Sequence, residues 1–122
     1  EPKNKFVASF IGDSNIITGI MKKDFLVHFD QQDFVCVDKG FKLNQVVDVV
    51  IRPEDIDITT VKKGLIEGQI INIVFKGVHF EILVKTKYRD FMIHTTDSYK
   101  INQKVGLKFN DEDIHVMSSE ND

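Results

Sequence analysis

A twelve-residue segment recurs in this chain, and the two copies constrain its fold more than any other feature. Residues 47–58 align with residues 105–116, an offset of 58 residues. The triplet Glu-Asp-Ile is identical in both copies, and apolar positions match on either side of it. Such a period predicts two similar units in tandem. Units this small bury little surface alone, so we expect them to share a core or to pack closely. Chance similarity of two strand–turn–strand pieces is the alternative.

Short β-rich runs fill the chain after residue 12, and turn-type clusters of Asp, Lys, Gln and Gly separate them. Many short strands with brief turns are typical of antiparallel barrels or sandwiches rather than of a parallel sheet. Five strands per copy suit a small Greek-key barrel of the OB type. The predicted fold class is therefore all-β, with two tandem OB-like small β-barrels. The ten runs span residues 15–21, 25–29, 33–37, 46–51, 56–58, 65–75, 78–84, 89–95, 105–109 and 114–117.

The first residues follow a different pattern. Apolar side chains recur with i, i+4 spacing over residues 2–11, with Pro2 near the start and Gly12 just after the end. This pattern predicts a short N-terminal amphipathic helix. The chain begins with Glu1 rather than Met, so we expect it to be cut from a longer protein. The predicted segments are a helix end or linker at 1–12, a first unit at 13–60, a second unit at 61–117 and a disordered tail at 118–122.

Net charge, cysteine content and hydropathy indicate in which compartment the chain functions and which classes of partner it can bind. The net charge of −3 gives no general attraction to phosphate backbones, so no nucleic-acid partner is expected. Cys36 is alone in the sequence, which favours a reducing compartment, and its apolar run predicts a buried, inert thiol. No apolar run approaches the roughly 20 residues of a membrane-spanning helix, and no signal peptide is apparent.

The sequence predicts no catalytic, cofactor-binding or metal-binding residues. No glycine precedes Lys-Ser or Lys-Thr, so the phosphate-cradling loop of P-loop ATPases is missing, as is a dinucleotide fingerprint. His28, His79, His94 and His115 lack the helical spacing of a zinc site. The acidic residues 54–55 and 111–113 lack the pattern of a calcium loop, so turns between strands are predicted there.

Two motifs resemble one known family. Residues 6–16, Phe-Val-Ala-Ser-Phe-Ile-Gly-Asp-Ser-Asn-Ile, are similar to the segment that joins the ATPase core to the accessory domain in ATP-binding subunits of ABC importers. Residues 51–56, Ile-Arg-Pro-Glu-Asp-Ile, are similar to a motif of that accessory domain. Their order and spacing resemble the transport-associated OB (TOBE) domain, with the closest likeness to spermidine/putrescine importers. The resemblance covers nearly the whole chain.

This resemblance implies a regulatory and dimerisation domain without chemistry of its own. ATP and Mg would belong to an upstream ATPase domain, whose last helix or linker would be residues 2–11. The implied partners are a second copy of the subunit and the membrane subunits of the transporter. The implied location is the cytoplasmic face of the cell membrane, as a peripheral part of the complex.

By motif position, the resemblance assigns structural or interface roles to Gly12, Asn15, Arg52, Pro53 and Glu54. Pro53 lacks an N–H and ends the preceding strand, whereas Arg52 and Glu54 could pair with charges on a partner. A well-packed turn without an interface role is the alternative. Two other functions stay open: a small-ligand sensor for an oxyanion or a polyamine, and an OB protein that binds nucleic acid.

Overall fold

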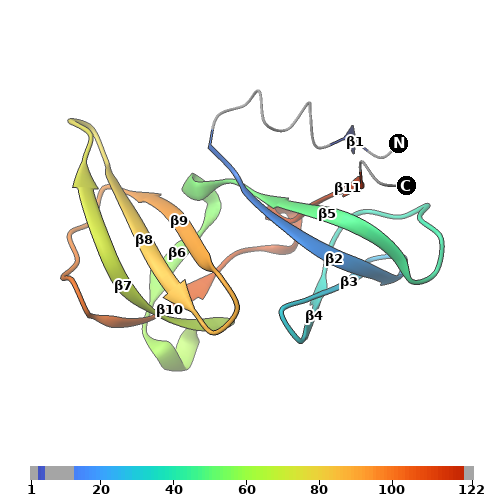
Figure 1. The fold of residues 1–122 in the computed structure, drawn as a ribbon, viewed down its shortest axis with the longest axis horizontal. Helices are drawn as coiled ribbons and strands as arrows, with labels where there is room; N and C mark the ends of the chain where they lie inside the picture. The colour runs from blue at the N-terminus through green and yellow to red at the C-terminus, as the bar shows by residue number, and fades with distance from the viewer. Residues whose placement is uncertain (1–2, 5–12, 120–122) are drawn as a thin grey trace. The chain divides into compact units, whose positions relative to one another are not determined.

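The computed structural model describes residues 3–4 and 13–119, with side chains for residues 13–119 (Figure 1). The described chain is almost entirely β, with three single-turn 3-10 helices, η1 (Pro53–Asp55), η2 (Val61–Lys63) and η3 (Asp111–Asp113). Each of the ten predicted strands is present within two residues of its expected ends. The strands are β1 (Lys3–Asn4), β2 (Asn15–Lys23), β3 (Leu26–Phe29), β4 (Gln32–Val35), β5 (Gln45–Ile51), β6 (Asp57–Thr59), β7 (Ile66–Phe75), β8 (Phe80–Thr86), β9 (Asp90–Thr95), β10 (Lys104–Lys108) and β11 (His115–Ser118).

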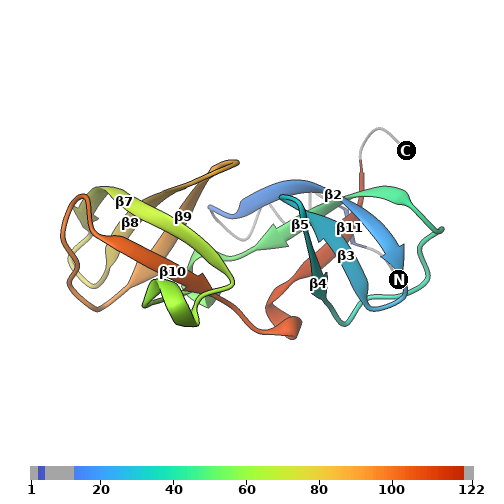
Figure 2. The same cartoon turned by 90° about the horizontal axis from the view of Figure 1, so that it is seen from below.

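The chain forms two compact units. Unit 1 contains Glu1–Ile51 and Asn110–Asp122, and unit 2 contains Arg52–Phe109. Unit 1 holds the sheet β1-β11-β5-β2-β3-β4, and unit 2 holds the sheet β6-β10-β7-β8-β9. Neighbouring strands are antiparallel, except that β1 runs parallel to β11. In unit 2, η1 packs against β9, and η2 packs against β10, where Figure 2 shows it beside the strand.

The two copies of the repeat exchange their last strands. The first copy forms β5, η1 and β6, and the second forms β10, η3 and β11 at the same offset of 58 residues. Strand β6 pairs with β10, whereas β11 pairs with β5, with Val116 opposite Val49. Apart from β1, both sheets therefore have the same strand order, and each is completed by the last strand of the other copy. The fold is two OB-like units, as predicted.

The exchange moves the unit boundaries away from the predicted ones. The units change at 51/52 and 109/110 rather than at 60/61, because the last strand of each copy forms its hydrogen bonds in the other sheet. Ser118 is the last residue of β11, so the predicted tail from 118 begins too early. The predicted N-terminal helix is not confirmed: Lys3–Asn4 form a strand, and residues 5–12, including Gly12, lie outside the described residues.

Each unit has its own apolar core, formed by the inward-facing residues of its strands. In unit 1 the rings of Phe29 and Phe34 stack with centroids 4.2 Å apart. Cys36 is also buried there, as predicted, and this burial raises the pKa of its thiol. The core side chains of unit 2 that are almost completely buried are Ile56, Ile70, Ile82, Val84, Phe91, Ile93, Val105 and Leu107.

None of the helices among the described residues is long and apolar enough to cross a membrane.

Candidate functional site

The motif Arg52-Pro53-Glu54 lies where the chain leaves unit 1 and enters unit 2. Pro53 is buried at the first position of η1, where its missing N–H costs no helical hydrogen bond. Arg52 Nε donates a hydrogen bond to Asp55 Oδ2 at 3.2 Å, and the N–H of Asp55 donates to the carbonyl of Arg52. The prediction of a turn at residues 54–55 is therefore confirmed, and Arg52 stabilises that turn.

Asn15 lies next to this motif through the register of β2 and β5. It is opposite Ile51, and its Nδ2 donates to the carbonyl of Ile51 at 3.2 Å. This bond fixes the end of β5 directly before Arg52. Asn15 therefore has a contact within the fold, the hydrogen bond to Ile51.

The second copy of the repeat forms the same turn with different side chains. Asn110 replaces Arg52, and its N–H donates to Asp113 Oδ2 at 2.8 Å in a capping box around η3. The prediction of a turn at residues 111–113 is therefore also confirmed. Glu112 occupies the position that corresponds to Glu54, on an exposed turn of unit 1.

Glu54 differs from its motif neighbours because it borders a groove in unit 2. The groove encloses about 630 Å³ between η1, β6, β9 and the segment that follows β9. Three of its lining side chains are carboxylates, and no lysine or arginine lines it among the described residues. The lining consists of Glu54, Ile56, Asp57, Ile58, His79, His94, Thr95, Thr96, Asp97 and Tyr99.

Tyr99 forms one wall of this acidic groove. Its hydroxyl donates a long hydrogen bond of 3.4 Å to the carbonyl of Ile58. Burial raises the pKa of Tyr99, and the nearby charges of Asp97 and Asp57 raise it further. The phenol is therefore neutral at physiological pH, and its ring adds an aromatic surface beside the carboxylates.

Two histidines of the groove lining lie against each other. The rings of His79 and His94 have centroids 4.5 Å apart and are inclined by 34°. His94 Nε2 is buried and 3.5 Å from Glu81 Oε1, a separation of an ion pair rather than of a well-aligned hydrogen bond. Glu81 also lies 3.5 Å from Lys76 Nζ. Helical spacing could not reveal this pair, because the hairpin register of β8 and β9 brings the two rings together.

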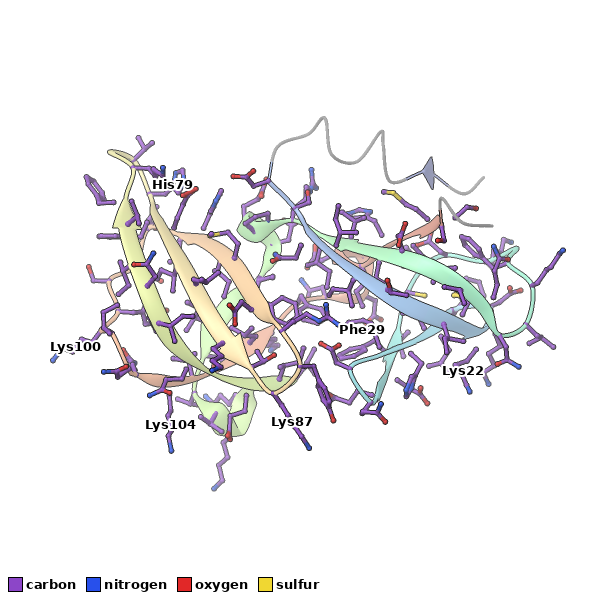
Figure 3. All side chains as sticks on the ribbon, in the orientation of Figure 1. Lys22, Phe29, His79, Lys87, Lys100 and Lys104 are labelled. Carbon is purple, nitrogen blue, oxygen red and sulfur yellow. The ribbon has the colours of Figure 1, made fainter. Side chains whose placement is uncertain are left out.

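The lysines of unit 2 that are labelled in Figure 3 do not line this groove. Lys87 and Lys104 project outward on the side of the unit that is remote from His79, and Lys100 projects outward from the segment between β9 and β10 (Figure 3). A groove with three carboxylates in its lining and no lysine or arginine among the described lining residues attracts cations and repels anions. The described residues contain no cluster of three or more His, Cys, Asp or Glu side chains that could hold a metal ion.

Comparison with known proteins identifies the family. A model of the TOBE domain matches residues 49–117, which include most of the first copy of the repeat and all of the second. The chain is 62% identical over 117 residues, 96% of its length, to the spermidine/putrescine import ATP-binding protein PotA of Aster yellows witches'-broom phytoplasma. It is 48% identical over 117 residues to the protein of that name from Desulfitobacterium hafniense, and 51% identical over 124 residues to that from Spiroplasma citri. It spans 28%, 34% and 35% of these relatives.

A solved structure shares the fold. The cytoplasmic molybdate-binding protein ModG, solved with molybdate bound, superposes with a TM-score of 0.73, covering 85% of this chain and 95% of its own. The sequence identity of 10% limits this likeness to the fold.

Proposed function

The chain belongs to the TOBE-domain family, and on that premise we propose that it is the regulatory domain of the ATP-binding subunit of a polyamine importer. The observation that carries the proposal is the alignment of nearly the whole chain with spermidine/putrescine import ATP-binding proteins. The domain has no chemistry of its own. ATP and Mg bind to an ATPase domain elsewhere in the subunit.

We further propose a pairing role for the domain and a contact with the rest of the transporter through its parent subunit. The domain pairs with a second copy and so helps to hold two ATPase subunits together. Through its parent, it works on the transporter's membrane subunits at the cytoplasmic face of the membrane. Support for both proposals comes from the family resemblance of residues 6–16 and 51–56.

Sedimentation equilibrium of the chain tests the pairing. We expect a reversible dimer over a micromolar to millimolar concentration series. Residues 6, 7, 10 and 11 are apolar in the sequence and could cause association of their own, so the same series is run with residues 1–11 deleted. Strictly monomeric behaviour of both proteins up to millimolar concentration would exclude the pairing role.

A second function is favoured by one observation, the carboxylate lining of the groove in unit 2. We propose that the groove binds a polyamine cation, so that the domain senses the transported substrate. Glu54, Asp57 and Asp97 supply charge-assisted acceptors for ammonium groups, and the ring of Tyr99 supplies a face for the same groups. The same lining disfavours an oxyanion, for which the groove offers no lysine or arginine among the described residues.

Replacing Glu54 by glutamine is expected to weaken spermidine binding about tenfold, because a charge-assisted hydrogen bond is lost. Isothermal titration calorimetry measures this change, with putrescine and molybdate as further ligands. Glu112→Gln is the matched control, since Glu112 has the corresponding position in the repeat but lies in unit 1. Equal spermidine affinity of the Glu54→Gln variant and the wild type, or molybdate binding alone, would contradict a cation-binding groove.

A further inference from the structure

One edge of unit 2 lacks a strand neighbour over part of its length. Strand β10 pairs with β7 only from Ile66 to Gln69, and Ile70 closes this pairing through hydrogen bonds with residues 102 and 103. Strand β8 continues beside β7 as far as Phe75. Figure 1 shows the β7–β8 hairpin extending past β10. Among the described residues, β7 therefore has a strand on one side only after Ile70.

The direction of the free backbone groups follows from the hairpin. Lys76 donates its N–H to the carbonyl of His79 across the turn, so its backbone groups face β8. Backbone groups alternate in direction along a strand of an antiparallel pair. The N–H and C=O groups of Ile73 and Phe75 therefore face the open edge, where an added strand could bind them.

The side chains of this edge are apolar and exposed. The exposed fractions are 41% for Val74, 61% for Phe75 and 81% for Val78 in the adjoining turn. The register shift between Ile70 and Asn72 lies at the end nearest β10, and residues 72–75 continue in regular pairing beyond it. Natural proteins protect exposed edges with charges, prolines or bulges, and residues 72–75 contain neither a charge nor a proline.

We propose that this edge pairs with the same edge of a second copy of the chain, in an antiparallel register with Val74 on the two-fold axis. The inference deepens the proposed pairing role and rests on it. Ile73 of each copy then lies opposite Phe75 of the other, and the two residues exchange both backbone hydrogen bonds. Four hydrogen bonds result across the axis.

The charges are compatible with this register. Asn72 of each copy lies opposite Lys76 of the other, so the lysines do not face each other. The pairs of isoleucine with phenylalanine are of a kind that stabilises antiparallel sheets. An isologous contact requires such self-complementarity, because each patch meets its own copy.

Two substitutions at the axis test the proposal in the full chain. Val74→Lys places two lysines directly opposite each other and should raise the dimer dissociation constant at least tenfold. Within its own unit the new lysine faces Glu81, so the fold tolerates it. Val74→Cys should form a disulfide-linked dimer on mild oxidation, because residues opposite each other outside the hydrogen-bonded pairs approach most closely. Val61→Lys and Val61→Cys are the controls, since Val61 is similarly exposed in η2 of the same unit.

The outcomes separate this inference from the pairing role. A wild-type dimer that Val74→Lys disrupts, together with crosslinking by Val74→Cys but not by Val61→Cys, supports the proposed edge. A wild-type dimer that persists in Val74→Lys, with no crosslinking through Val74→Cys, overturns the edge and leaves pairing through another surface. A wild-type monomer overturns both.

Discussion

We expect the replacement of Gly106 by alanine to lower the free energy of unfolding of unit 2 by about 3 kcal/mol, the upper range of overpacking costs. A Cβ atom at this position would lie 2.4 Å from the carbonyl oxygen of Thr60 and 2.8 Å from Cα of Gly64. These are backbone atoms, so no flexible side chain can move away. Strand β10 and the segment around η2 would have to separate.

Urea unfolding followed by tyrosine fluorescence measures this loss. Tyr88 and Tyr99 are the only tyrosines of the chain, and both belong to unit 2. Lys104→Ala, on the exposed face of the same strand, is the control and should change the free energy by no more than about 0.5 kcal/mol. Gly64→Ala should resemble Gly106→Ala, since the two glycines face each other. A Gly106→Ala protein as stable as the control would contradict the close approach.

The second large effect concerns the identical triplets of the repeat. Ile56 and Ile114 occupy the same position in the two copies, and each is 2% exposed. Because of the strand exchange, Ile56 lies in unit 2 and Ile114 in unit 1. We expect Ile114→Ala to destabilise unit 1, and Ile56→Ala to destabilise unit 2, each by about 2–5 kcal/mol.

Native-state hydrogen exchange reports on the units separately. Slow amides of β2 and β5 report on unit 1, and those of β7 and β8 report on unit 2. The two variants serve as controls for each other. If Ile114→Ala instead released the amides of β7 and β8, the contiguous boundary at 60/61 would hold and the exchange would be refuted.

The strands could be predicted from the sequence, but the exchange could not. Apolar runs and turn clusters define each strand from local residues alone, and the recurrence of residues 47–58 indicates two units. Which sheet a final strand joins depends on contacts between distant residues. Strands β6 and β11 have similar local patterns, so either partner was compatible with the sequence.

The candidate site was predictable only in part. Motif resemblance led to Glu54, which borders the groove, and to Arg52, which pairs with Asp55 in its own turn. The contact between the rings of His79 and His94 was not predictable, because only the pairing of β8 with β9 brings them together. Tyr99 lies outside the regular strands, where no periodicity marks a side chain as part of a site.

The role proposed for this chain is regulation of an ATPase by a domain that performs no chemistry itself. The most direct test measures ATP hydrolysis by the full-length protein as spermidine is raised, for the wild type, Glu54→Gln and Glu112→Gln. We expect equal basal rates in all three, and a spermidine response that shifts to about tenfold higher concentration in Glu54→Gln alone. A basal rate that falls in Glu54→Gln, or a spermidine response that this substitution leaves unchanged, would contradict it.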